Sequence, residues 1–126
     1  QMRFNFRFGT ASTEQKLRNA VEEMLDRHNL EYSLSWNCSG QAFITEPGSL
    51  TAAASEAIKE ICNLDTELST SGGTSDGRFI APTGAQVIEL GVRNATIHQV
   101  DEQIACSEID TTHALYKRII EKLLLD

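Results

Sequence analysis

The segment MRFNFRF, residues 2–8, decides the fold that the sequence predicts. Its apolar side chains alternate with arginine and asparagine, which is the period of a β-strand with one buried face. Apolar residues then recur with helical spacing through residues 12–29, and alternation returns in LEYSLSWN, residues 30–37. These residues together predict one β-α-β unit.

The predicted helix has recognisable ends. Ser12 or Thr13 provides an N-cap hydroxyl, and Gln15 would complete a capping box with Ser12. Asn29 suits the left-handed residue that often follows a helix. The apolar face of this helix is predicted to consist of Leu17, Ala20, Val21, Met24 and Leu25.

A β-α-β unit is incomplete by itself. Two parallel strands joined by a helix leave unpaired backbone groups on both edges, and a sheet is usually stable only with three or more strands. The sequence therefore predicts that a further half-domain or a second subunit completes the sheet.

Residues 41–49 divide the chain, because periodicity stops there and glycine and proline interrupt it. The expected fold class is mixed α/β (α+β), in two parts that comprise residues 1–43 and 44–126. The second part is predicted to contain a helix that Ser49 caps, short strands at 66–70 and 85–91, and a helix at 108–125. The apolar faces of its helices are predicted to be Leu50, Ala53, Ala54, Ala57, Ile58 and Ile61, and Ile109, Tyr116, Ile119, Ile120, Leu123 and Leu124.

Composition limits the classes of function. The 126 residues, 40% of them hydrophobic, suffice for one compact domain or two small subdomains. Lys and Arg number 11 against 18 Asp and Glu, so the net charge is −7, and without a basic stripe we expect no nucleic-acid partner. The cysteines lack a CxxC spacing, which favours a reducing compartment. With no signal pattern and no apolar run of about 18 residues, we expect a soluble, cytoplasmic protein that binds no membrane.

The stretch SGGTSDGRF, residues 71–79, contains three glycines among hydroxyl and charged residues. Glycine lets a ligand approach the backbone and exposes N–H donors to an anion. The stretch lacks the spacing of a Walker loop or a dinucleotide fingerprint. Local sequence leaves two interpretations equally open, an anion-binding loop and a polar turn between two strands.

His98 lies in NATIHQVDE, residues 94–102, and is one of three histidines. A metal ligand and a structural histidine are equally consistent with its position in a short extended stretch. Catalytic zinc needs about three protein ligands and an open position for water, and the chain has no recognisable spacing of that kind. Asp76, Asp101 and Glu102 are candidate ligands only through their nearness in sequence.

Three further residues have more ordinary interpretations. Arg7 projects from the polar face of the first predicted strand, where it can clamp a carboxylate, although such arginines are more often solvated. His28 stands at a helix end, where a capping role is common. His113 lies near the apolar face of the last predicted helix, which favours a packing role.

Taken together, STSGGTSDGRFIAPTGAQVIELGVRNATIHQVDE, residues 69–102, closely resembles the C-terminal catalytic segment of the succinyl-diaminopimelate desuccinylase family. These are dinuclear zinc amidohydrolases of the aminoacylase and carboxypeptidase type. FNFRF and YSLSWNCSGQAFIT resemble the end of that family's lid, or dimerisation, domain and its return to the catalytic domain. The resemblance covers essentially the whole chain, and its most specific motifs are GGTSDGRF and NATIH.

The resemblance implies a homodimer with two zinc ions, for which cobalt can substitute. A strand-exchanged oligomer is the alternative by which this chain could recover missing strand pairings. It implies hydrolysis of the small-molecule substrate N-succinyl-LL-diaminopimelate to succinate and LL-diaminopimelate in lysine and cell-wall precursor synthesis. By position, His98 matches a zinc ligand and Arg7 a lid arginine that clamps a carboxylate. The residues that match substrate-binding positions are Gly73, Thr74 and Asn94.

The other metal ligands of that family, and the glutamate that acts as its general base, have no counterpart in these residues. The resemblance thus makes residues 1–43 the C-terminal part of the lid and residues 44–126 the C-terminal part of the catalytic domain. We expect no catalytic residue in this chain and no hydrolase activity from it alone. Two alternatives stay open: an autonomous dimerisation or interaction module without catalysis, and a related N-acyl-amino-acid amidohydrolase.

Overall fold

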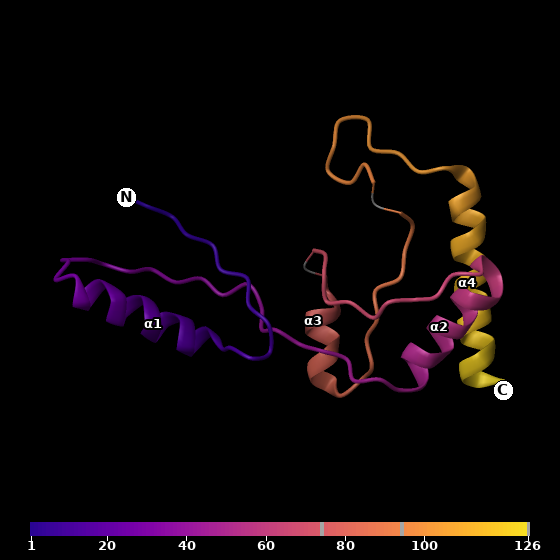
Figure 1. The fold of residues 1–126 in the computed structure, drawn as a ribbon, viewed down its shortest axis with the longest axis horizontal. Coiled ribbons are helices and arrows are strands. Elements are labelled where there is room, and N and C mark those ends of the chain that lie inside the picture. The colour runs from indigo at the N-terminus through magenta and orange to yellow at the C-terminus, as the bar shows by residue number, and fades with distance from the viewer. Residues whose placement is uncertain (74, 94, 126) are drawn as a thin grey trace. The chain divides into compact units, whose positions relative to one another are not determined.

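The computed structural model describes residues 1–73, 75–93 and 95–125. Over these residues the chain forms helices joined by long irregular segments (Figure 1). None of the described helices combines the length and apolar character needed to cross a membrane. The elements are α1 (Glu14–Arg27), α2 (Ser49–Cys62), α3 (Gly77–Ile80), the 3₁₀ turn η1 (Ala81–Thr83) and α4 (Cys106–Leu124).

The prediction of a mixed α/β fold with a β-α-β unit is wrong, because the described residues contain no strand and no sheet. Segments 2–8 and 30–37 keep their alternating sequence but form no hydrogen-bonded ladder, and the same holds for 66–70 and 85–91. Alternation shows which side chains share a face, whereas a strand exists only through pairing with a neighbour. A helix satisfies its backbone hydrogen bonds within its own segment, which is why the three longer helices form where the sequence predicts them.

Contacts divide the chain into two compact units, residues 1–44 with 74–84 and residues 45–73 with 85–126. The first unit contains α1, and Thr13 is its N-cap, with its Oγ1 accepting a hydrogen bond from the Lys16 backbone N–H at 3.2 Å. The alternative capping box does not form, since Gln15 donates its amide to another side chain within α1. Asn29 has a φ of 52°, which confirms the predicted left-handed residue after the helix.

The apolar face of α1 is not buried. No residue of this helix is buried, and Met24 is 58% exposed. An aromatic cluster lies nearby, where the Phe6 and Trp36 rings stack with centroids 6.0 Å apart and Arg18 Cζ lies 5.3 Å from the centre of the Trp36 ring. Arg18 also forms an ion pair with Glu14 one turn earlier. In the first unit, the partly buried side chains of Arg18 and Trp36 connect α1 to the segment that contains Trp36.

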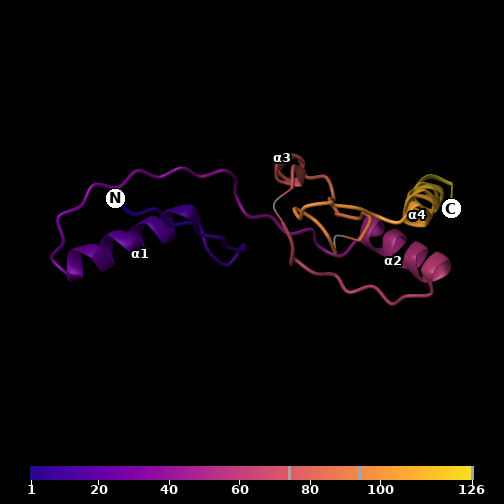
Figure 2. The same cartoon turned by 90° about the horizontal axis from the view of Figure 1, so that it is seen from above.

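The second unit contains a hydrophobic core between α2 and α4, which run side by side in both views (Figures 1 and 2). Ala57 is fully buried at this contact, and small alanine side chains allow the two helices to approach closely. On α4 the buried residues are Leu115 and Ile119, one turn apart. The predicted apolar face of α4 is wrong in part, because Ile109 and Ile120 are more than half exposed. The core consists of Ala53, Ala54, Ala57, Leu115 and Ile119.

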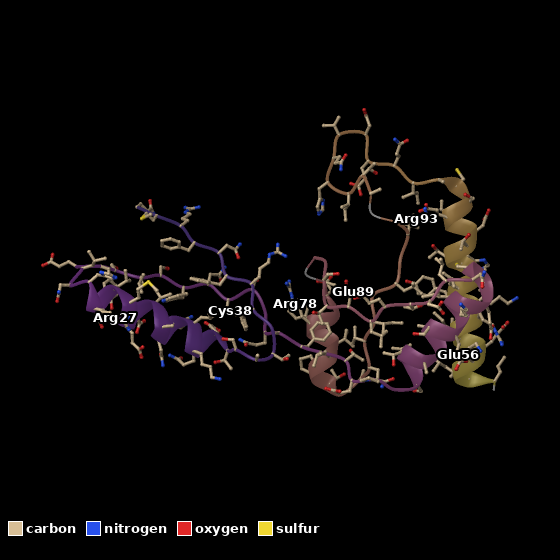
Figure 3. The ribbon with its side chains drawn as sticks, viewed as in Figure 1. Arg27, Cys38, Glu56, Arg78, Glu89 and Arg93 are labelled. Carbon is tan, nitrogen blue, oxygen red and sulfur yellow. The ribbon has the colours of Figure 1, made fainter. Side chains whose placement is uncertain are left out.

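Charged side chains reinforce the contact between α2 and α4. Arg118 Nε lies 2.8 Å from Glu60 Oε2, and Lys122 Nζ lies 2.8 Å from carboxylate oxygens of both Glu56 and Glu60. Figure 3 labels Glu56 on α2. Hydrogen bonds from Arg118 and then Lys122 lower the pKa of Glu60 to about 2, and the two glutamates raise the pKa of Lys122. Both charges are therefore retained across the neutral range.

The N-terminus of α2 is capped by Gly48 rather than by Ser49, which is the first helical residue. The missing side-chain acceptor comes from far along the chain, because Gln86 Oε1 accepts a hydrogen bond from the Leu50 backbone N–H at 2.9 Å. The Thr51 hydroxyl also bonds to the backbone of Gly48. The bond from Leu50 to Gln86 fastens the segment after residue 85 to the start of α2.

Candidate functional site

His98 lies in the segment 95–105, which precedes α4 in the second unit. Its φ is 61°, and that of Asp101 is 62°, so two non-glycine residues within four positions adopt the left-handed conformation. Each such residue costs about 1–2 kcal/mol, so the conformation persists only where surrounding interactions offset that cost. The His98 backbone N–H donates to Glu102 Oε2 at 3.3 Å. The imidazole is at an exposed position.

Hydrogen bonds close this loop on itself. Thr96 Oγ1 donates to the carbonyl oxygen of Gln103 at 2.9 Å and accepts from the backbone N–H of Gln103 at 3.0 Å. Within the loop, Gln99 donates its backbone N–H to the Thr96 carbonyl at 3.0 Å and its side-chain amide to the Ala95 carbonyl at 3.2 Å. His98 therefore lies within the stretch from Thr96 to Gln103, whose two ends are hydrogen-bonded to each other.

Side chains of α4 hold the chain on the N-terminal side of this loop. The Arg93 backbone N–H donates to Glu108 Oε2 at 3.2 Å, and Arg93 Nε lies 3.6 Å from Glu108 Oε1 (Figure 3 labels Arg93). The Tyr116 hydroxyl donates to the Leu90 carbonyl oxygen. Between the loop and the start of α4 is an open recess of about 380 Å³, lined by Arg93, Ala95, Gln103, Ile104, Ala105 and Glu108.

The side chains around His98 do not form a complete metal site. No group of three His, Cys, Asp or Glu side chains that could hold a metal ion occurs within residues 1–73, 75–93 and 95–125. An exposed imidazole without a hydrogen-bond partner in that part of the chain is chemically suited to bind zinc. Asp76, one of the sequence candidates, belongs to the first unit, where it is the N-cap residue of α3.

The glycine-rich stretch does not form a turn between two strands, because it leads into α3. Gly72 has a φ of 116°, a conformation that requires glycine, and the predicted site residue Gly73 is exposed. Further on, Ser75 Oγ accepts a hydrogen bond from the Gly77 backbone N–H at 3.1 Å. The predicted site residues Thr74 and Asn94 lie outside the described residues.

Arg78 is a candidate that sequence reasoning did not select. Its Nε atom is buried and has no hydrogen-bond partner among the described residues, and its guanidinium Cζ lies 4.7 Å from the centre of the Phe79 ring (Figure 3). Its stem passes so close to Gly40 that a Cβ there would lie 2.7 Å from Arg78 Cδ. An arginine within a glycine-rich loop was the available signal. The unsatisfied donor gives Arg78 the capacity to bind an anion.

Arg7 is exposed and makes no hydrogen bond or ion pair with the rest of the described chain. It belongs to the first unit, whereas Gly73 and His98 belong to the second. The neighbouring Phe6 is fixed by its stacking on Trp36, which leaves the Arg7 guanidinium free to bind a carboxylate.

The other two histidines lie on helices. His28 is the C-cap residue of α1, in agreement with the predicted helix-end role. His113 is exposed on α4, so the predicted packing role is wrong. The reason is that the buried side of α4 runs through Leu115 and Ile119 and does not include position 113.

The class of protein follows from a family comparison. The model of peptidase family M20/M25/M40 matches residues 4–122, which is nearly the whole chain. The chain belongs to this family. The matched range contains Arg7, the glycine-rich stretch and His98.

Two of the most similar relatives carry the same enzyme name. The chain is 57% identical over 126 residues to the succinyl-diaminopimelate desuccinylase of Psychrobacter sp. (strain PRwf-1), covering 97% of this chain and 31% of that protein. It is 52% identical over 126 residues to the enzyme of the same name from Thioalkalivibrio sulfidiphilus (strain HL-EbGR7), covering 100% of this chain and 34% of the relative. It thus spans about a third of the length of the curated relatives that it matches.

Proposed function

We propose that the chain is the C-terminal part of a zinc-dependent amidohydrolase that converts N-succinyl-LL-diaminopimelate to succinate and LL-diaminopimelate. The observation that carries this proposal is the 52–57% identity to succinyl-diaminopimelate desuccinylases along essentially the whole chain. Because the chain spans about a third of those relatives, the activity belongs to the longer protein. In this proposal, residues 1–43 are part of the lid and residues 44–126 part of the catalytic domain of a cytoplasmic homodimer.

His98 is the proposed zinc ligand of this segment. Its exposed imidazole and its backbone conformation support this role, because the loop turns the residue outward instead of packing it. When bound, two zinc ions, or cobalt in their place, would supply Lewis-acid activation of a water molecule. The remaining ligands and the general base come from the rest of the enzyme, since no described cluster provides them here.

The proposed substrate-binding residues of this chain contact carboxylate and amine groups of the substrate. Arg7 clamps a substrate carboxylate, as its unpaired guanidinium allows. Gly73, Thr74 and Asn94 hold the diaminopimelate end. Arg78 is a further anion-binding candidate, because a buried guanidinium donor without a partner gains a hydrogen bond when a carboxylate binds.

The test is a split-enzyme assay. The chain is expressed separately from the N-terminal two-thirds of the Psychrobacter relative, and hydrolysis of N-succinyl-LL-diaminopimelate is measured with zinc for each part and for the mixture. We expect no turnover by either part alone and turnover by the mixture, which the variant His98→Ala abolishes. His113→Ala, on the exposed side of α4, is the matched control and should leave turnover unchanged. Turnover by this chain alone, or unchanged turnover with His98→Ala, would contradict the proposal.

An autonomous interaction module is the second candidate function. The observation that favours it is the number of large apolar side chains left exposed, among them Met2 at 79%, Val100 at 93% and Leu124 at 76%. In that case the mixture would show no turnover while the chain alone would self-associate in sedimentation experiments.

A further inference from the structure

We propose that Thr96 is the positioning residue for His98, and that Glu108 anchors the same loop to α4. This inference rests on the proposed function, because it concerns how a metal-binding imidazole is held. Neither Thr96 nor Glu108 touches substrate or metal in the proposed site. Their part is to fix the backbone from which the imidazole projects.

The loop cannot be fixed by hydrophobic packing. Ile97 and Val100, its large apolar residues, are 46% and 93% exposed. The loop also contains the two left-handed residues, His98 and Asp101, whose backbone conformation is unfavourable for residues with a Cβ. Such a conformation persists only where surrounding interactions enforce it. Hydrogen bonds must therefore enforce it here.

The Thr96 side chain makes the bonds that close the loop. Its hydroxyl is both donor and acceptor to the backbone of Gln103, at 2.9 Å and 3.0 Å. His98 and Asp101 both lie between Thr96 and Gln103. The Thr96 side chain therefore holds together the two ends of the stretch that contains the left-handed residues. The additional hydrogen bond from the His98 N–H to Glu102 lies between Thr96 and Gln103 and is longer, at 3.3 Å.

Glu108 connects the closed loop to the core of the second unit. Both of its carboxylate oxygens face Arg93, one accepting from the backbone N–H at 3.2 Å and the other 3.6 Å from the guanidinium Nε. Glu108 lies in the first turn of α4, the helix that carries Leu115 and Ile119 into the core. Glu108 therefore connects the loop to the helix that contributes Leu115 and Ile119 to the core of this unit.

A metal ligand depends on such support. A ligand must be held to within about 0.5 Å of its productive position, and residues that orient ligands typically contribute about 10–100-fold to metal affinity. The imidazole of His98 makes no hydrogen bond within the described part of the chain that could orient it directly. Its placement then depends on the backbone, and so on Thr96.

The experiment uses an enzyme in which this chain replaces the matching part of the Psychrobacter relative. Cobalt(II) is titrated into the metal-free enzyme and binding is followed by visible absorption. The test variant is Thr96→Val, which keeps the shape of the side chain but removes both hydrogen bonds. Thr96→Ser restores the hydroxyl. Thr111→Val is the matched control, because Thr111 Oγ1 only donates to the carbonyl of Ser107 within α4.

We expect Thr96→Val to weaken cobalt binding about 10-fold or more at the site that His98→Ala also weakens. Thr96→Ser and Thr111→Val should stay within about twofold of the parent, and Glu108→Ala should weaken binding as Thr96→Val does. Parental affinity in Thr96→Val, together with a loss in His98→Ala, would overturn the positioning role and leave the proposed function standing. Equal losses in Thr96→Val and Thr111→Val would also overturn it, as general destabilisation. Parental affinity in His98→Ala would refute the proposed function itself.

Discussion

Helix α1 and the pair α2 and α4 begin from the same kind of sequence and differ in what they bury. Each helix has apolar residues at helical spacing, and α1 has a well-formed N-cap of its own at Thr13. No residue of α1 is buried, however, whereas Ala57 of α2 and Leu115 of α4 are at most 6% exposed. The difference is that α2 and α4 bury each other's apolar side chains, whereas no described helix packs against α1 in this way.

The comparison shows that an amphipathic pattern predicts a helix better than it predicts a core. The pattern is local and is satisfied by backbone hydrogen bonds within one segment. Burial needs a second surface of matching shape, and most helical stability in proteins comes from such packing. Ion pairs differ in a similar way. Helices α2 and α4 have pairs that cross between them, in addition to pairs within α4, while the Arg18 and Glu14 pair stays within α1.

Core truncation should give the largest difference between the two regions. Leu115→Ala removes buried methyl groups from the contact between α2 and α4 and should lower the free energy of unfolding by about 2–5 kcal/mol. Met24→Ala on α1, where the side chain is 58% exposed, should change it by about 0.5 kcal/mol or less. Urea unfolding followed by far-ultraviolet circular dichroism measures both. A loss of similar size in Met24→Ala would show that α1 is packed in solution, and the comparison would fail.

The cap of α2 should give an intermediate effect. Gln86→Ala removes the acceptor for the Leu50 N–H and should cost about 1 kcal/mol. Gly48→Ala should act through the same bond, because a Cβ at Gly48 would lie 1.8 Å from Gln86 Nε2 and displace the amide. The double variant should therefore cost little more than either single one in the same urea experiment. Additive losses would mean that Gly48 and Gln86 act independently.

The ion pairs between α2 and α4 should make stability depend on pH. The pKa of Glu60 is about 2 in the folded protein and ordinarily 4.5, so its contribution is complete above pH 4.5 and is lost as the pH falls towards 2. The urea midpoint of the chain should fall over that range, and Glu60→Gln should reduce the dependence. Glu67→Gln, which removes an exposed carboxylate with no described ion pair, is the control. An unchanged pH profile in Glu60→Gln would contradict the role of this carboxylate.

The smallest effect concerns the aromatic cluster of the first unit. The chain has one tryptophan, so fluorescence reports on Trp36 alone. Arg18→Ala removes the guanidinium above the indole, an interaction of about 0.5–1 kcal/mol, and should shift the emission to longer wavelength. Arg27→Ala, in the last turn of the same helix, should leave the emission unchanged. An equal shift in both variants would assign the effect to fraying of α1 and not to the stacked arginine.

For the candidate site, the sequence predicted which residues take part but not how they are arranged in space. The sequence indicated His98, and the structure adds its left-handed backbone and the hydrogen bonds between Thr96 and Gln103. Those features could not be predicted, because a bond between residues seven apart depends on the path of the loop. Arg78 was missed for a similar reason, since its unsatisfied Nε becomes visible only after Gly40 and Phe79 pack around the side chain.

By itself, the sequence determined the positions of the three long helices and the left-handed residue at Asn29, and it limited the first N-cap to Ser12 or Thr13, because each depends on interactions within a few residues. The sequence pattern also carried the family membership. Only the tertiary structure decided that residues 2–8 and 30–37 form no sheet within the described chain, and that α4 buries Leu115 and Ile119 while Ile109 stays exposed. Strand pairing and burial require a partner surface, and no local pattern of residues specifies which surface that is.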